Sequence, residues 1–248
     1  MSIDRLYHDP ELAELYDLDN GWGEDLDYCL ALGDRVSSVL DLGCGTGRLI
    51  AELARHRVAV GVDPAEAMLA VARRRPGGDR ATWITGDART VRLGQTFDLV
   101  VMTGHAFQTL LTGDDQLAAL RTIAGHLAPE GRFIVDTRNP LLEEWRAWTP
   151  ERSRRTLSHP RLGPLEAWND VRRDPVTGNI TYETHYRVIG SGRTISGTNS
   201  ELRFTDRDGL ADLISAAGLA VEAWLGDWMG GPCTPQSPEI IPYGGLAT

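Results

Sequence analysis

Short apolar runs alternate with helical patterns between residues 37 and 139, and this alternation is the feature that most constrains the fold. The apolar runs cover residues 38–42, 58–62, 82–84, 98–102 and 132–136, and apolar residues recur at helical spacing over 48–55, 65–74 and 116–127. Strands that read as continuous apolar runs, separated by helices, are typical of a parallel sheet covered on both faces. The pattern therefore predicts an α/β fold with a doubly wound, mostly parallel sheet.

The segments on either side of this region follow other patterns. Residues 1–34 are polar and aromatic, with helices expected over 9–16 and 25–32. Three later runs of β-branched and aromatic residues are separated by turn signals, which predicts antiparallel hairpins over 165–172, 180–189 and 194–204. A helix is expected over 206–217, ended by Gly218, and two further strands over 219–225 and 239–243.

Composition excludes several classes of protein. All 25 basic residues are arginine, so the chain lacks the lysine that pyridoxal-phosphate enzymes, Schiff-base aldolases and Walker-type phosphate loops require. The net charge of −10 argues against nonspecific binding to a phosphate backbone, and we expect the arginine runs at 73–75 and 152–155 to be solvated surface. The sequence has no apolar run of about 18 residues, so no membrane segment is expected. It also has no signal-peptide pattern and no disulfide framework, so we expect a cytoplasmic protein.

A glycine-rich turn at residues 43–47, Gly-Cys-Gly-Thr-Gly, joins the first apolar run to the first helix. Glycine permits a tight turn and lets the backbone approach a ligand closely. Dinucleotide-binding enzymes space these glycines G-x-G-x-x-G, whereas this chain has G-x-G-x-G preceded by an acid at Asp41. The turn resembles the first motif of class I S-adenosylmethionine-dependent methyltransferases, whose Rossmann-like fold agrees with the predicted sheet.

Asp63 ends the second apolar run, where an acid in a Rossmann-like sheet accepts both ribose hydroxyls. The same segment is typical of a helix N-cap, with Pro64 at N1 and Glu66 at N3. Both roles can hold, because a carboxylate has about four acceptor positions. Residues 86–89, 97–107 and 126–132 also resemble the family's later motifs, although Glu130 stands where the family usually has glycine.

The resemblance implies a set of cofactor contacts. Asp87 would take the adenine amino group, Met68 would pack on the adenine or else in the core, and Arg48 would reach the methionine carboxylate or else be an exposed helix residue. The full set expected to bind S-adenosylmethionine is Tyr16, Trp22, Asp41, Gly43, Cys44, Gly45, Thr46, Gly47, Arg48, Asp63, Pro64, Met68, Gly86, Asp87, Ala88, Arg89, Thr103, Gly104 and His105. No metal site is expected.

The resemblance also divides the chain into four parts. An N-terminal helical lid (1–34) precedes the cofactor-binding core (35–140), an antiparallel β insertion on the substrate side follows (141–204), and the final helix and strands of the core complete it (205–248). The insertion is similar to that of amino-sugar and glycine-type N-methyltransferases. The sequence leaves the oligomeric state open, a homodimer included.

The acceptor side is less closely defined. The catalytic candidates are His105, directly after the fourth strand, and His185, on an expected strand of the insertion. Alternation puts Tyr182, Thr184 and Tyr186 opposite Glu183 and His185, but leaves open which face covers the site and whether His105 only packs in its loop. Expected substrate contacts are Arg138, Trp145, Trp148, Trp168 and Tyr182, and the candidates for contact with an anionic acceptor are Arg89, Arg138 and Arg187.

These motifs together predict an S-adenosylmethionine-dependent methyltransferase that methylates nitrogen or oxygen of a small molecule by in-line transfer and releases S-adenosylhomocysteine. A nucleic-acid methyltransferase acting on RNA is the first alternative. Enzymes that methylate base amino groups, however, carry Asn/Asp-Pro-Pro-aromatic where this chain has Thr103–Ala106. A noncatalytic cofactor-binding protein is the second alternative.

Overall fold

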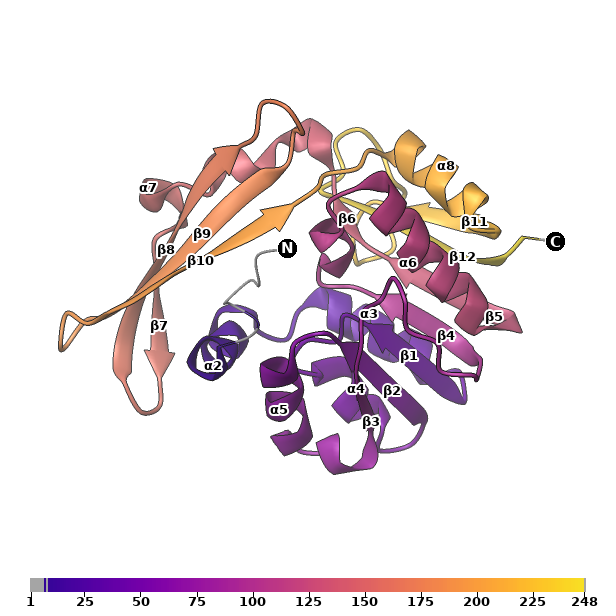
Figure 1. The fold of residues 1–248 in the computed structure, drawn as a ribbon, viewed down its shortest axis with the longest axis horizontal. Helices are drawn as coiled ribbons and strands as arrows, with labels where there is room; N and C mark the ends of the chain where they lie inside the picture. Colours follow the sequence, from indigo (N-terminus) through magenta and orange to yellow (C-terminus); the bar gives the residue numbers. More distant parts are fainter. Residues whose placement is uncertain (1–6, 8, 248) are drawn as a thin grey trace.

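The computed structural model describes residue 7 and residues 9–247, and its centre is a mixed β-sheet (Figure 1). The strands of this sheet are β1 (Ser38–Leu42), β2 (Val58–Asp63), β3 (Thr82–Thr85), β4 (Phe97–Met102), β5 (Leu127–Val135), β6 (Thr137–Arg138), β11 (Leu219–Leu225) and β12 (Glu239–Leu246). Their order is β3-β2-β1-β4-β5-β12-β11, with β6 paired to β12. Neighbours from β3 to β5 are parallel, whereas β12 is antiparallel to β5 and β11. The predicted doubly wound, mostly parallel sheet is confirmed.

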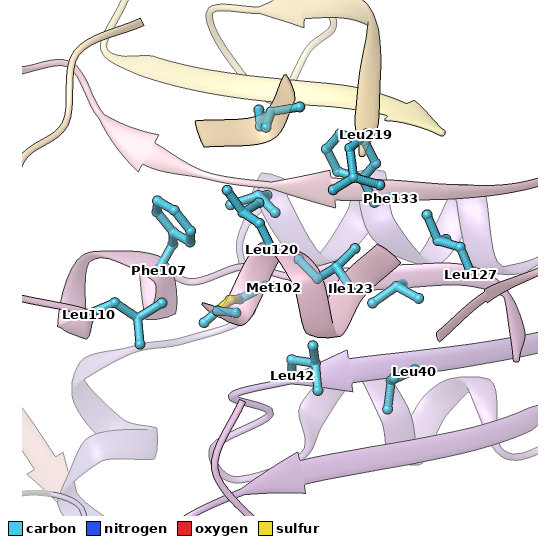
Figure 2. Packing of buried hydrophobic residues seen from close by; sticks show 14 of the residues in the cluster. Leu40, Leu42, Met102, Phe107, Leu110, Leu120, Ile123, Leu127, Phe133 and Leu219 are labelled. Carbon is cyan, nitrogen blue, oxygen red and sulfur yellow. The ribbon is translucent and has the colours of Figure 1, made fainter. Parts of the chain in front are cut away.

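Helices cover both faces of this sheet. The helices are α2 (Pro10–Asp19), α3 (Glu24–Gly33), α4 (Arg48–Leu53), α5 (Glu66–Arg74), α6 (Gly113–His126), α7 (Pro150–Ser153) and α8 (Arg207–Ala216), with short turns η1 (Gly78–Arg80), η2 (Ala106–Thr109), η3 (Pro140–Leu142) and η4 (Glu144–Ala147). Side chains alternate along a strand, so Val39 of β1 packs towards α3 and α4 while Leu40 and Leu42 pack towards α6 and α8. Figure 2 shows the second of these layers.

A second, antiparallel sheet stands beside the central one (Figure 1). It consists of β7 (Arg155–His159), β8 (Gly163–Arg173), β9 (Ile180–Val188) and β10 (Thr194–Leu202), in the order β10-β9-β8-β7. Helix α2 lies between the two sheets, because Leu12 and Leu15 pack against Leu165 and Tyr186 of the insertion. Ala13 packs against the α5 region of the core.

Two local expectations differ from the structure. Strand β7 begins in the arginine run at 152–155, which we expected to be only surface, because Leu157 alternates with polar residues and packs beside α2. Asp63 is not the N-cap of α5: β2 extends through Asp63, and the N-cap is Ala65. Asp63 nevertheless accepts a hydrogen bond from the Ala65 N–H at 2.8 Å. Among the described residues, no helix is both long and apolar enough for a membrane crossing.

Candidate functional site

A large cavity opens at the carboxyl edge of the central sheet, beside the neighbouring strands β1 and β4, where the strand order reverses. Residues of α2 and of the insertion sheet line its other side, and its volume is about 1150 Å³. Pockets for a single small molecule measure roughly 300–1,000 Å³. The cavity therefore has room for a cofactor and an acceptor together.

The glycine-rich turn forms one wall of this cavity. Gly43, Gly45 and Gly47 all have positive φ, at 82°, 52° and 72°, a conformation that is strained for other residues. A Cβ at Gly43 would stand 2.8 Å from Ala106 Cβ, whereas a Cβ at Gly45 would have nothing within 4 Å. A Cβ at Gly47 would overlap the Trp83 ring. Gly43 and Gly45 line the cavity, and Gly47 instead permits close packing beneath the turn.

Asp63 holds this turn from the end of β2. Its Oδ2 accepts a hydrogen bond from the Gly45 N–H at 2.8 Å, and its Oδ1 accepts the bond from Ala65 described above. The side chain is buried and lines the cavity. Asp63 therefore fixes the conformation of the glycine-rich turn from within the cavity wall.

Asp41, two residues before the turn, is a buried acid that lines the same cavity. Burial raises the pKa of Asp41 to about 8, and the carboxylates of Asp63 and Asp136 add to the rise. A cation placed beside Asp41 would reverse this shift, because an opposite charge favours the ionised form of a carboxyl group.

Asp87 lies at the cavity wall after β3 and is bound to Arg89. Asp87 Oδ1 accepts hydrogen bonds from the Arg89 N–H at 2.8 Å and from Arg89 Nε at 2.9 Å. Arg89 also donates to Asp115 Oδ1 at 2.7 Å. Hydrogen bonding from Arg89 lowers the pKa of Asp87, so this carboxylate is ionised at neutral pH and Arg89 is neutralised by two acids.

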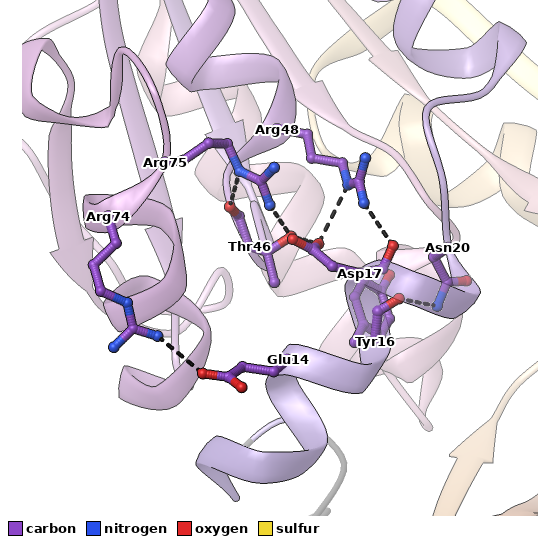
Figure 3. Close-up of polar contacts among 8 residues, drawn as sticks. All are labelled: Glu14, Tyr16, Asp17, Asn20, Thr46, Arg48, Arg74 and Arg75. Carbon is purple, nitrogen blue, oxygen red and sulfur yellow. Dashed lines mark hydrogen bonds and ion pairs between the residues drawn. The ribbon is translucent and has the colours of Figure 1, made fainter. Parts of the chain in front are cut away.

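Helix α2 is fastened to the glycine-rich turn by Asp17 (Figure 3). Asp17 Oδ1 accepts hydrogen bonds from Thr46 Oγ1 at 2.5 Å and from Arg48 Nε at 3.2 Å, and Asp17 Oδ2 pairs with Arg75. Arg48 Nη2 also donates to the Asp17 carbonyl at 2.7 Å. Arg48, expected at the methionine carboxylate, is thus bound to helix α2, although it still lines the cavity.

The inner face of the insertion sheet forms the opposite end of the cavity. Tyr182, Thr184 and Tyr186 of β9 line it, which answers the question of orientation that alternation left open. The outer face carries His185, whose ring stacks on Trp168 at 5.2 Å between centroids and lies 3.4 Å from Asp170 Oδ2. His185 is therefore separated from the cavity by its own strand.

Three titratable side chains converge on the cavity where β4, β5 and β12 have their adjacent ends. His105 Nε2 lies 3.0 Å from Glu239 Oε1 and 3.7 Å from Asp136 Oδ2. Strand β12 is antiparallel to β5, so its first residue reaches the edge where the parallel strands end. Such a cluster can hold a proton or a cationic group.

Arg138 and Trp148 lie beside this cluster and line the cavity. The Arg138 guanidinium lies 5.2 Å above the Trp148 ring, its Nε is 2.8 Å from Glu144 Oε1, and its Nη1 donates to Gln108 Oε1 at 3.0 Å. Trp148 in turn makes an edge contact with Tyr182, with 5.5 Å between ring centroids. Arg138 is consequently neutralised and held in one position.

The structure brings most of the predicted site residues together. Those that line the cavity are Tyr16, Asp41, Gly43, Cys44, Gly45, Thr46, Arg48, Asp63, Pro64, Met68, Asp87, Ala88, Arg89, Thr103, Gly104, His105, Arg138, Trp148 and Tyr182. Others lie elsewhere, namely Trp22, Gly47, Gly86, Trp145, Trp168, His185 and Arg187. Trp22 is 42% exposed and donates to Asp27, Trp145 packs edge-on against Phe204, and Arg187 pairs with Glu166 on the outer face.

Sequence reasoning missed Asp136 and Glu239. Asp136 follows the apolar run of β5, and a polar residue at that position was an available signal because parallel strands end at one edge. Nothing near Glu239 in the sequence indicated its place, because that place depends on the antiparallel pairing of β12 with β5. The arginine run at 73–75 forms ion pairs with Glu66, Glu14 and Asp17, so these arginines are partnered by acids.

Comparison with known proteins gives a consistent set of similarities. Residues 39–131 match the family described as "Methyltransferase domain". The chain is 32% identical over 230 residues to the dTDP-3-amino-3,6-dideoxy-alpha-D-glucopyranose N,N-dimethyltransferase of Streptomyces fradiae, covering 86% of this chain and 85% of that protein. It is 30% identical over 211 residues to the cypemycin N-terminal methyltransferase of a Streptomyces species, covering 82% and 81% of the two chains.

Solved structures share the whole fold. The CcbJ methyltransferase from Streptomyces caelestis superimposes with a TM-score of 0.77 at 21% identity, over 96% of each chain. At this identity the likeness concerns the fold, including the insertion sheet, and not the chemistry of individual residues.

Proposed function

The chain belongs to the class I S-adenosylmethionine-dependent methyltransferases, and on that basis we propose that it methylates the amino nitrogen of a deoxyamino sugar. The observation that carries the proposal is the chemistry of the acceptor end of the cavity, where Asp136 and Glu239 lie beside His105. Carboxylates stabilise a cationic amine and disfavour an anionic acceptor group. Arg138, which lies beside this cluster, is already paired with Glu144.

The cofactor end fits S-adenosylmethionine in shape and in donor chemistry. The backbone of Gly43 and Gly45 lines the cavity, and the space at Gly45 that a Cβ would fill is open. Asp63 and Asp87 would hold the ribose and the adenine, and Asp41 would face the cationic methionine part. When bound, S-adenosylmethionine supplies a methyl group on a sulfonium sulfur, which is itself the activated group.

The chain's own contribution to the reaction is binding and alignment. Residues of the glycine-rich turn hold one reactant, and the tyrosine face of β9 with Arg138 and Glu239 holds the other across the same cavity. Alignment of this kind can contribute on the order of 7–11 kcal/mol to a bimolecular transfer. The relative from Streptomyces fradiae acts on an amino sugar by its name, which supports the same acceptor class here.

The test uses labelled S-adenosylmethionine with dTDP-3-amino-3,6-dideoxyglucose as the probe acceptor and its 3-hydroxy counterpart as the control. We expect transfer of one or two methyl groups to the amine, detected by mass spectrometry, and none to the hydroxyl compound. Transfer to the hydroxyl compound alone, or to a peptide N-terminus in preference to the sugar, would contradict the proposed acceptor class.

A further inference from the structure

Glu239 lines the cavity, and one of its carboxylate oxygens has no hydrogen-bond partner among the described residues. Its Oε1 lies 3.0 Å from His105 Nε2, whereas its Oε2 is buried and has no hydrogen-bond partner in the described part of the chain. A buried polar atom without a partner carries a free-energy cost. A ligand that donates a hydrogen bond to Oε2 would remove that cost.

The other two members of the cluster, Asp136 and His105, already have hydrogen-bond partners. Both carboxylate oxygens of Asp136 accept the backbone N–H of His105, at 3.0 and 3.2 Å. This contact holds His105 in the left-handed conformation, with φ of 62°. Asp136 therefore positions His105, and His105 directs one oxygen of Glu239, leaving the second oxygen for the acceptor.

The charges around Glu239 suit a group that binds and releases a proton near neutral pH. Burial raises the pKa of Glu239 to about 7, with Asp25 of α3 adding to the rise and Arg138 of β6 opposing it. Burial likewise raises the pKa of Asp136 to about 6. Burial lowers the pKa of His105 and Arg138 adds to the fall, whereas Asp136, Glu144 of η4 and Asp25 act in the opposite direction.

We propose that Glu239 accepts the proton of the acceptor's ammonium group, with Asp136 and His105 as positioning residues. This inference rests on the proposed function, because it concerns an amine acceptor. An ammonium nitrogen has no lone pair with which to attack a methyl group. One N–H bond breaks, its electron pair remains on nitrogen for the new N–C bond, and the proton forms an O–H bond with Glu239 Oε2. Water takes the proton after the product leaves.

A binding experiment tests Glu239 independently of turnover. Calorimetry with the S-adenosylhomocysteine complex would compare dTDP-3-amino-3,6-dideoxyglucose with its 3-hydroxy counterpart. The wild-type chain should prefer the amine by at least about tenfold, the usual size of a hydrogen bond to a charged group. Glu239→Gln should lose that preference while its affinity for S-adenosylhomocysteine stays within about twofold. Equal affinities of the wild-type chain for the two sugars would overturn the inference.

Kinetics with the same amine probe separate a chemical role from a structural one. Glu239→Gln should lower kcat/KM about 100-fold at pH 7, a typical contribution of general-base catalysis. The loss should shrink as the pH rises to the amine's own pKa, because the solvent then supplies free amine. Glu222→Gln, a carboxylate of β11 that pairs with Arg132 on the surface, is the matched control and should leave the rate unchanged.

Several outcomes would contradict this role. A loss that is equal at every pH, or an unchanged rate, would mean that Glu239 is not the proton acceptor. Inactivation by a chelator with recovery on adding Mg²⁺ or Zn²⁺ would mean that the cluster binds a metal ion instead. Failure of the wild-type chain to methylate the amine, with its binding preference intact, would contradict the proposed function and the proton transfer, and would leave Glu239 only as a residue that binds the amine.

Discussion

The two ends of the cavity are built in different ways. The cofactor end comes from the turns that follow β1, β2 and β3, three neighbouring parallel strands within about fifty residues of chain. The acceptor end combines segments from His105 to Glu239, contributed by both sheets. Asp63 and Asp87 are bound by nearby backbone N–H groups, whereas Glu239 retains a buried oxygen without a partner. Local sequence therefore accounts for the first end, whereas the second end depends on how segments far apart in the chain pack together.

The largest effect is expected at Gly47, beneath the cofactor end. Gly47→Ala combines a strained positive φ with overlap of the new Cβ and the Trp83 ring. The two costs should together lower the free energy of unfolding by about 3 kcal/mol, measured by urea denaturation. Gly94→Ala is the matched control: its φ is also positive, at 69°, but nothing lies within 4 Å, so a loss of only about 1 kcal/mol is expected. Equal losses would mean that packing against Trp83 is unimportant.

Asp63→Asn should weaken ligand binding at the cofactor end of the cavity. The amide cannot accept hydrogen bonds from both Gly45 and Ala65 and also serve a ribose, so we expect about 30-fold weaker binding of S-adenosylhomocysteine by calorimetry. Tyr182→Phe changes the acceptor end and should leave that affinity within about twofold. If Tyr182→Phe weakened cofactor binding as much as Asp63→Asn, the division of the cavity into two ends would be wrong.

The raised pKa of Asp41 predicts a smaller effect, a change of folding stability with pH. Because the pKa of Asp41 is raised to about 8 in the folded chain and is about 4 when unfolded, the folded state holds the proton more tightly over this range. The contribution of Asp41 to stability without cofactor should therefore be fully present below about pH 4 and should be lost as the pH rises through 8.

Thermal unfolding between pH 5 and pH 8 provides the measurement. Asp41→Asn should reduce the loss of unfolding free energy between pH 5 and pH 8 by at least about 1 kcal/mol. The raised pKa values of Asp136 and Glu239 should account for the loss that this variant retains. The exposed Asp212 of α8 is the control, and Asp212→Asn should leave the slope unchanged. S-adenosylmethionine should reduce the decline in the wild-type chain, since its positive charges favour ionised Asp41. A slope that Asp41→Asn does not change would contradict the assignment.

The mostly parallel central sheet and the place of the glycine-rich turn were predictable because both follow from local pattern. Apolar runs alternating with helices require a covered parallel sheet, and the carboxyl ends of its strands must share one edge, which brings Gly43, Asp63 and Asp87 together. The N-cap of α5 was misplaced by two residues, because β2 continued pairing with β3 through Asp63. Pairing between strands was not visible in the local sequence.

The sequence by itself determined the parallel sheet, the class of cofactor and the place of the glycine-rich turn beside Asp63 and Asp87, since these depend on spacings within single strand-turn-helix units. Only the tertiary structure decided which face of β9 meets the cavity, that Arg48 binds the lid through Asp17, and that Glu239 lies beside His105. Those contacts join residues up to 134 positions apart, and their positions depend on how the strands and the lid pack together, which no local spacing records.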